Sequence, residues 1–273
     1  MDLSATQVPS ATAGTATPLV EFRNVGLRIR GQEIIRDLSF SLERGRFACV
    51  IGPSGCGKTT TLRLIAGLMK PTSGTVLYEG RPIAGPSREV VVVFQDYGKA
   101  LLPWRTAAGN IALVLETLDV PRAEHADRIH ALLGKVGLAG KSGLYPSEMS
   151  GGMQQRLQIA RCLAQEPRLL LMDEPFGALD AMTRQTLQDE MQAIAADTGT
   201  TVFFVTHDLE EAAYLGDRVI GLLPHPGRMG IAIDIPLARP RDQLTTRSQQ
   251  AFLDIRRDLF TFIKGAEAQR EHA

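Results

Sequence analysis

A glycine-rich loop is the segment of the sequence whose residue types point most clearly to chemistry. Its residues are, in order, Gly52, Pro53, Ser54, Gly55, Cys56, Gly57, Lys58, Thr59 and Thr60. They match every fixed position of the phosphate-binding loop pattern, in which glycines let consecutive backbone N–H groups surround a phosphate. Lys58 would reach the β- and γ-phosphates, and the Thr59 hydroxyl would ligate Mg²⁺. The alternative is an ordinary glycine-rich turn, which the position between an expected strand and an expected helix disfavours.

Two acids, Asp173 and Glu174, end an apolar stretch at residues 169–172. The tip of a buried strand is a costly place for two carboxylates unless a cation or a water needs them. We therefore expect Asp173 to hold Mg²⁺ through its water shell and Glu174 to polarise an attacking water. Alone, such a pair is more typical of a helix cap or a solvated turn, and the phosphate-binding loop elsewhere in the chain favours the catalytic interpretation.

A second anion-binding segment begins at Ser150, which is followed by Gly151 and Gly152. Ser150 would cap an expected helix, while the uncovered N–H groups of its first turn face outward and favour an anion. A plain capped helix is the alternative. Two phosphate-binding helix starts in one chain indicate one nucleotide held between two subunits.

The elements that position these residues alternate in type. The apolar run at 47–51 precedes the glycine-rich loop, and residues 59–69 carry apolar side chains at helical spacing, which predicts a strand, a loop and a helix. Further along, expected strands and helices alternate at 169–172, 181–197, 202–205, 209–215 and 219–223. This alternation predicts parallel strands joined by crossover helices.

The rest of the chain predicts two smaller units. Short alternating stretches between residues 19 and 42 are typical of an antiparallel sheet, and further short strands follow at 75–78 and 90–94. Residues 107–152 indicate several helices without a strand. The predicted fold class is α/β, with a mostly parallel sheet, an antiparallel β subdomain and a helical subdomain at about residues 100–160.

The ends of the chain differ from the middle. Residues 1–18 are mostly Ser, Thr, Ala and Pro without Lys or Arg, so we expect a disordered tail rather than a secretory signal. The main domain is expected at 19–240 and a helical extension at 241–273. In that extension one helical face, predicted to pack on the body or on a partner, carries Phe252, Ile255, Leu259 and Phe262.

Composition narrows the class of protein. Thirty Lys plus Arg balance thirty Asp plus Glu, which argues against a protein whose main partner is nucleic acid. No apolar run reaches the roughly 18 residues that span a bilayer. Three cysteines without a CxxC pair favour a reducing compartment, and the expected location is cytoplasmic.

The order and approximate spacing of the motifs resemble those of an ABC transporter ATPase. The segments that carry the resemblance are 52–60, Gln95, 150–156, 173–175, 178–180 and 206–208. It extends over nearly the whole chain after the tail. More narrowly, the sequences LLPWRT at 101–106, DEPFGAL at 173–179 and VTHDLEEA at 205–212 resemble the importer subfamily for nitrate, sulfonate and taurine.

The resemblance implies a role for each matching residue. The loop at 52–60 would bind ATP with Mg²⁺, Gln95 would sense the metal and the γ-phosphate, and Ser150 to Gly152 would contact the ATP held by a partner subunit. Asp180 would bridge the two sites, Glu174 would be the general base, and His207 would contact the γ-phosphate. If the family resemblance is set aside, His207 is expected to be a surface histidine with its hydrogen bonds made, and Gln95 a polar loop residue.

The leading hypothesis is the motor subunit of an importer, peripheral on the inner face of the cell membrane. Two copies would sandwich two ATP molecules and drive a separate integral membrane permease, which an extracytoplasmic solute-binding protein supplies with an oxyanion or sulfonate. The alternatives are a soluble ABC-type ATPase acting on DNA or ribosomes and an inactive scaffold. The intact catalytic acid and signature serine, Glu174 and Ser150, disfavour the scaffold.

Three residues raise further hypotheses. Where the family stacks adenine on an aromatic, this chain has Ile29 or Arg30, and the Arg30 guanidinium would partly substitute. Trp104, the single tryptophan, either meets the permease or is a core aromatic. Cys56, beside Lys58 and a helix N-terminus, is either a reactive thiolate or only a small residue that fits the loop.

Overall fold

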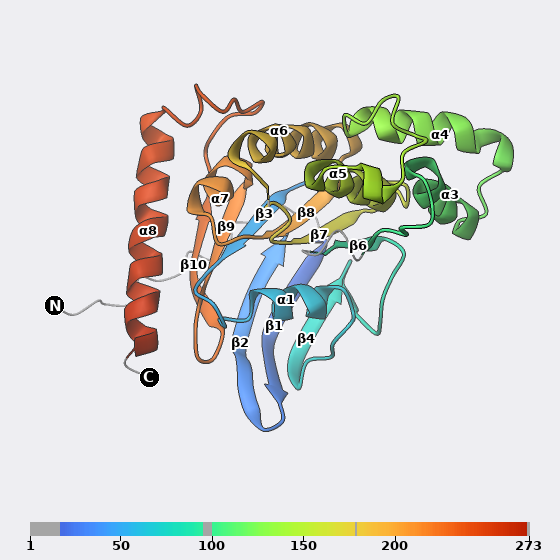
Figure 1. Cartoon of the computed structure of the whole chain (residues 1–273). Helices are drawn as coiled ribbons and strands as arrows, with labels where there is room; N and C mark the ends of the chain where they lie inside the picture. Colours follow the sequence, from blue (N-terminus) through green and yellow to red (C-terminus); the bar gives the residue numbers. More distant parts are fainter. Residues whose placement is uncertain (1–16, 95–99, 178, 272–273) are drawn as a thin grey trace.

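The computed structural model describes residues 17–94, 100–177 and 179–271 of the chain. Two sheets and a set of helices form its layers (Figure 1). Within these residues, no helix combines the length and the apolar character needed to span a bilayer.

The central sheet has six strands in the order β10-β9-β3-β8-β7-β6. Its strands are β3 (Phe47–Ile51), β6 (Val90–Val93), β7 (Leu169–Asp173), β8 (Thr201–Val205), β9 (Arg218–Leu223) and β10 (Arg228–Asp234). Neighbouring strands from β6 to β9 run parallel, and β10 pairs antiparallel with β9. The predicted mostly parallel sheet is therefore confirmed, whereas the edge strand β10 was not predicted.

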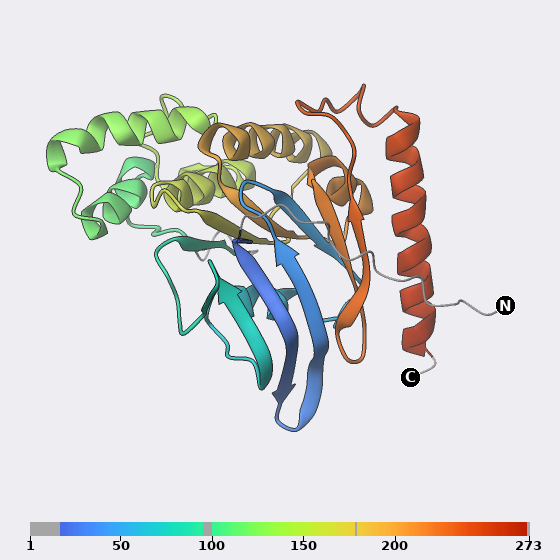
Figure 2. The same cartoon turned by 180° about the vertical axis from the view of Figure 1, so that it is seen from behind.

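The second sheet is antiparallel and has the order β2-β1-β4-β5. Its strands are β1 (Val20–Ile29), β2 (Gln32–Leu42), β4 (Ser73–Tyr78) and β5 (Arg81–Pro82). This is the antiparallel unit expected from the alternation between residues 19 and 42. It lies on the same side of the central sheet as helix α1 (Lys58–Ile65), as the two opposite views show (Figures 1 and 2).

Alternate residues of the central strands enter two different cores. In β3, Cys49 and Ile51 pack with helices on one face, while Ala48 and Val50 pack with α1 and the antiparallel sheet on the other. Because successive side chains of a strand point to opposite faces, a strand covered on both sides must be apolar throughout. All five residues of β3 are buried, which explains its continuous apolar sequence.

The remaining helices cover one face and one edge of the central sheet. They are α3 (Ala107–Thr117), α4 (Arg122–Lys135), the 3₁₀ turn η1 (Pro146–Glu148), α5 (Gly151–Leu163), α6 (Ala181–Thr198), α7 (Leu209–Leu215) and α8 (Gln250–Glu271). Helices α3 and α4 project to one side of the body, and α8 lies along the opposite edge beside β9 and β10 (Figure 1).

Helix α8 packs on the body through the face that its periodicity predicts. Phe252, Ile255 and Leu259 are buried in the core formed with the other helices. The ring of Phe262 lies over the two glycines of β9 and β10: a Cβ added to Gly221 would lie 2.5 Å from it, and one added to Gly230 would also lie 2.5 Å away. Only strands without side chains at these positions leave room for the ring.

Candidate active site

The loops that carry the candidate residues meet at one edge of the central sheet. Strands β3, β7 and β8 are parallel neighbours, so their C-terminal ends lie at the same edge. The glycine-rich loop follows β3, Glu174 follows β7, and the segment 206–208 follows β8. Ligands of open parallel sheets bind outside the C-terminal ends of the strands, which places the candidate site here.

The glycine-rich loop has the backbone that close approach to an anion requires. Gly52, Gly55 and Gly57 have φ angles of 152°, 82° and 93°, a region that side chains disfavour. A Cβ on Gly52 would lie 2.6 Å from the Sγ of Cys56. Helix α1 begins directly after the loop with no side-chain cap and no acidic residue in its first turn. Its free N–H groups and its dipole are therefore available to a phosphate.

Lys58 lies folded onto the loop. Its Nζ donates hydrogen bonds to the backbone oxygens of Gly52, at 2.7 Å, and of Pro53, at 3.2 Å, and the residue is 8% exposed. The ammonium is thus held at the concave side of the loop, where a phosphate oxygen would replace a carbonyl as its partner.

Thr59 and Asp173 bring two oxygen ligands together. The Thr59 hydroxyl donates to Oδ1 of Asp173 at 3.2 Å, and burial raises the pKa of this carboxyl because the charged form is desolvated. Beside phosphates, Mg²⁺ is usually bound by only one or two protein oxygens, because phosphate oxygens and waters complete its coordination shell. A hydroxyl and a carboxylate can supply these protein oxygens. The residues present therefore fit this ion.

Glu174 and His207 form the second pair at this edge. His207 Nδ1 lies 3.2 Å from Oε2 of Glu174, and the imidazole is largely exposed. Glu174 adopts a left-handed backbone with a φ of 45°, and its N–H donates to the Val205 oxygen at 2.9 Å. Such strain in a non-glycine residue persists where the surrounding structure fixes it, and it is concentrated at functional sites.

A small cavity lies beside this pair. Its volume is about 30 Å³. It is lined by Glu174, Phe176, Gly177, Arg184, Thr206, His207, Asp208 and Glu211. This volume accommodates one or two waters, which need polar partners of the kind that these carboxylates and hydroxyls supply. A carboxylate, an imidazole and a water-sized space at the phosphate edge are the components that hydrolysis by water requires.

Ser150 and Asp180 both cap helices. Ser150 Oγ accepts from the N–H of Met153 at 3.3 Å, and Asp180 Oδ1 accepts from the N–H of Thr183 at 3.0 Å. The two helix starts are adjacent, because a Cβ on Gly152 would lie 2.7 Å from Cγ2 of Thr183. In the described ranges, no hydrogen bond joins them to the glycine-rich loop. The two capped helix starts are therefore neighbours in the fold.

The hypothesis of a reactive Cys56 is contradicted by the structure. The side chain is fully buried in the core below the loop, and burial raises the pKa of its thiol. The neighbouring Lys58 lowers that pKa, but the desolvation of the thiolate has the larger effect. Cys56 is therefore the small loop residue of the alternative interpretation.

Other sequence-predicted residues have different outcomes. Gln95 lies outside the described residues, as does Ala178. Trp104 is 72% exposed, which excludes the core aromatic as its interpretation. Arg30 is an exposed residue in the turn between β1 and β2, with a φ of 50°, and its stacking on a base stays a prediction.

Sequence analysis assigned no role to Glu211 and Gln188, two buried polar residues next to the site. Glu211 stands three residues after Asp208, the N-cap of α7, whose side chain accepts from the N–H groups of Glu210 and Glu211. An acid three positions after a capping residue is a recognisable sequence signal. No comparable signal exists for Gln188, which lies in the middle of α6.

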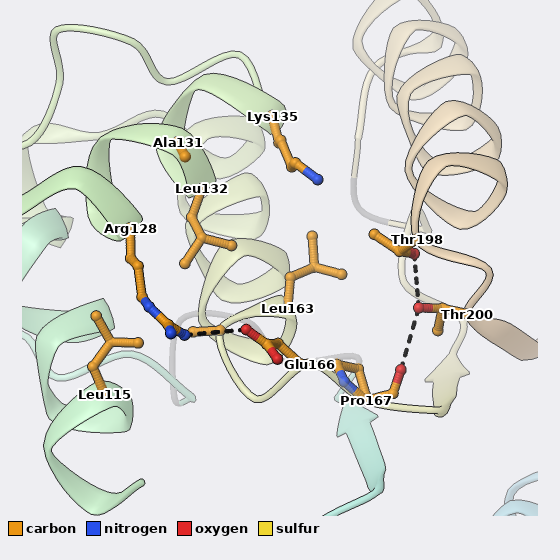
Figure 3. A pocket seen from close by; sticks show the side chains of 11 residues that line it. Leu115, Arg128, Ala131, Leu132, Lys135, Leu163, Glu166, Pro167, Thr198 and Thr200 are labelled. Carbon is orange, nitrogen blue, oxygen red and sulfur yellow. Dashed lines mark hydrogen bonds and ion pairs between the residues drawn. The ribbon is translucent and has the colours of Figure 1, made fainter. Parts of the chain in front are cut away.

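A larger cavity of about 400 Å³ is lined by residues other than those of this site. Its lining side chains are drawn in Figure 3. It opens beside α4 and the ends of α5 and α6, where Pro167 and Thr200 precede β7 and β8. Arg128 and Glu166, joined at 3.1 Å, both line it. Because it lies at the N-terminal ends of the strands, this cavity is not the site defined by the phosphate-binding loop.

The fold and the glycine-rich loop together define a P-loop nucleotide-binding protein. Residues 35–177 match the family described as "ABC transporter", which is more than half of the chain. The chain belongs to this family, and the resemblance found in the sequence is confirmed. Family membership includes ATP binding.

Relatives with importer names extend over most of the chain. It is 43% identical over 241 residues to "Aliphatic sulfonates import ATP-binding protein SsuB 2" of Burkholderia cenocepacia, covering 88% of this chain and 87% of the relative. It is 39% identical over 263 residues to "Nitrate import ATP-binding protein NrtD" of Synechococcus elongatus, covering 94% of this chain and 95% of the relative. These names match the predicted nitrate and sulfonate importer subfamily.

The same fold occurs in a solved structure, cbiO1 of Clostridium perfringens, described as part of the ABC transporter complex cbiONQ. The TM-score is 0.75 at 22% sequence identity, covering 80% of this chain and 89% of the other. The predicted fold class is thereby confirmed.

Proposed function

We propose that the chain is the ATP-hydrolysing subunit of an importer and energises the uptake of a small solute through a separate membrane permease. The observation that carries this proposal is the convergence of the loop after β3, the Thr59–Asp173 pair and the Glu174–His207 pair at one sheet edge. The importer names of the relatives support the coupling to transport.

The chemistry assigned to the chain is an in-line attack of water on the γ-phosphate. The N–H groups of the glycine-rich loop and the Lys58 ammonium hold the phosphates. Glu174 accepts a proton from the attacking water, and the exposed imidazole of His207 donates a hydrogen bond to a γ-phosphate oxygen. Nδ1 faces Glu174, so the hydrogen bond to the γ-phosphate would come from Nε2–H, and the two contacts exist together only when both ring nitrogens carry a proton.

Mg²⁺ would be held by Thr59 and, through water, by Asp173. When bound, it neutralises charge on the phosphate oxygens. Gln95 would contact the same ion, as the family resemblance implies. The pair of oxygens at 3.2 Å is the structural support for this site.

The partners proposed for the chain are a second copy of itself, a membrane permease and, indirectly, an extracytoplasmic solute-binding protein. Ser150, Gly151, Gly152 and Asp180 would complete the ATP site of the second copy, as the family resemblance implies, and the adjacency of the two helix starts is consistent with a shared role. The exposed Trp104 supports a docking surface in the segment 101–106. Such a complex would place the chain on the inner face of the membrane.

The proposed solute is an oxyanion or a sulfonate, because relatives are named for nitrate and aliphatic sulfonates. Neither of these relatives is named for DNA or ribosomes, so the soluble alternative has no support. The test is to express the chain with an affinity tag, identify the copurifying membrane subunits and measure solute uptake with and without them. Uptake of nitrate or a sulfonate that stops when the chain is deleted supports the proposal, and unchanged uptake of both overturns it.

A further inference from the structure

Glu211 is a buried carboxyl that the proposed mechanism does not use. It is 4% exposed, and burial raises its pKa. None of the Lys and Arg side chains in the described residues forms an ion pair with it. Its two oxygens instead accept hydrogen bonds, Oε2 from the Thr206 hydroxyl and Oε1 from Nε2 of Gln188 at 3.0 Å. A buried polar network that is satisfied in this way fixes the geometry of its members.

Thr206 connects Glu211 to the backbone on both sides of His207. Its hydroxyl also accepts from the N–H of Asp208 at 3.0 Å. The side chain of Asp208 in turn caps α7 by accepting from the N–H of Glu211 at 3.1 Å. His207 itself is largely exposed and pairs with Glu174, so the direction of its imidazole depends on the backbone that Thr206 and Asp208 hold.

Gln188 connects Glu211 to the segment that precedes α8. It is 1% exposed, and its Oε1 accepts from Arg247 at 3.1 Å and from Gln243 at 3.3 Å. Arg247 also donates to Oε2 of Glu210 at 2.9 Å, and its guanidinium lies 4.9 Å from the centre of the Tyr214 ring. The guanidinium therefore contacts both α6 and α7 next to the network.

We propose that Glu211, Gln188 and Arg247 are positioning residues for His207, through which the segment 241–271 determines the rate of hydrolysis without touching the nucleotide. The contacts run from Arg247 to Gln188, Glu211 and Thr206, and from there to the backbone that carries His207. This inference rests on the proposed function, because the position of His207 matters only if it contacts the γ-phosphate.

The test variant is Arg247→Met, in which the unbranched side chain still packs on Tyr214 but donates no hydrogen bonds. We expect the kcat for ATP to fall about three- to tenfold, because three charge-assisted hydrogen bonds are lost, to Gln188, Glu210 and Gln243. The KM for ATP should stay unchanged, since Arg247 does not contact the glycine-rich loop. Arg247→Lys should recover part of the kcat, because its ammonium still donates to Gln188 or Glu210.

The matched control is Arg257→Met, on the same C-terminal segment. Arg257 is an exposed arginine that pairs with Asp254 on its own helix at 2.7 Å. This variant should keep the wild-type kcat. An equal fall of kcat in Arg247→Met and Arg257→Met would show that the loss of any positive charge from residues 241–271 lowers the rate. That result would overturn the inference.

A readout independent of hydrolysis separates this inference from the proposed function. Hydrogen exchange, followed by mass spectrometry on the full chain, should accelerate several-fold in the peptide 206–212 of Arg247→Met and stay unchanged in β3. Unchanged exchange at 206–212, or uniform acceleration along the chain, overturns the positioning role. If the wild type hydrolyses no ATP, the proposed function fails, whereas local acceleration at 206–212 would still support the link from Arg247 to the His207 loop.

Discussion

The hydroxyl of Thr59 donates a hydrogen bond to the carboxylate of Asp173, 114 positions away in the sequence. Thr59 lies in the first turn of the helix after β3, and Asp173 is the last residue of β7. Strand β8 pairs with both β3 and β7. The pair therefore depends on the strand order of the central sheet, and it links the phosphate-binding loop to the acidic pair.

Replacing Thr59 with valine tests the metal site at nearly constant volume. Thr59→Val removes one oxygen ligand, so the Mg²⁺ concentration for half-maximal hydrolysis should rise about tenfold or more, and turnover should fall at any fixed concentration. Titrating phosphate release against Mg²⁺ measures both. Thr59→Ser keeps the hydroxyl and should resemble the wild type. An unchanged Mg²⁺ titration in Thr59→Val would contradict the assignment of this residue.

Asp173→Asn should stabilise the nucleotide-free protein while abolishing hydrolysis. Burial raises the folded-state pKa of this carboxyl, so its charged form costs stability at neutral pH. That cost disappears as the pH falls through the raised pKa and the native carboxyl takes up a proton. The unfolding midpoint of the variant should therefore lie about 2 °C above wild type at pH 7.5. This difference should shrink as the pH is lowered and the native carboxyl takes up a proton, and a midpoint below wild type at pH 7.5 would contradict the stabilising effect.

Glu174→Gln separates chemistry from binding. The amide keeps the volume of the side chain but cannot accept a proton from water, so single-turnover hydrolysis should fall by on the order of 100-fold. ATP binding, measured by equilibrium titration, should survive, and the variant should accumulate as an ATP-bound dimer. If hydrolysis in a single turnover stays near the wild-type rate, Glu174 is not the general base.

The parts of the fold with strong local patterns could be predicted from the sequence. The buried run 47–51, the glycine-rich loop and the helix after it are adjacent in the chain, and the structure has them as β3, the loop and α1. Strand β10 was missed although Met229, Ile231 and Ile233 alternate with smaller or charged residues. As an antiparallel edge strand it is only partly buried, so its apolar signal is weak.

The environment of a side chain could not be predicted, because it depends on segments far apart in the sequence. Sequence reasoning for Cys56 considered its neighbours Gly55 and Lys58, yet burial decides its pKa, and the core around it includes residues from β1, β2 and β9. The position of Gln188 beside Glu211 likewise requires α6 and α7 to be packed together. Helical periodicity cannot distinguish such a buried glutamine from an exposed one.

Thiol titration tests the burial of the cysteines directly. Cys49, Cys56 and Cys162 are all buried, and burial raises the pKa of each thiol, to about 12 for Cys162. In the native chain, almost no thiol should therefore react with a thiol reagent in the first minutes at pH 7.5. In the unfolded chain, all three thiols should react. A Cys56→Ser variant should show two when unfolded. One fast-reacting thiol in the native wild type that is lost in Cys56→Ser would restore the reactive-cysteine hypothesis.

Trp104 provides a fluorescence signal for permease docking, because it is the single tryptophan in the chain and 72% of it is exposed. The free subunit should show the red-shifted emission of a hydrated indole and strong quenching by iodide. Docking on the permease would remove water from the ring, so adding permease in detergent micelles should shift the emission to the blue and protect it from iodide. The control is the same wild-type subunit mixed with detergent micelles that hold no permease. Emission and quenching that do not change when the two proteins cosediment would place Trp104 outside the interface.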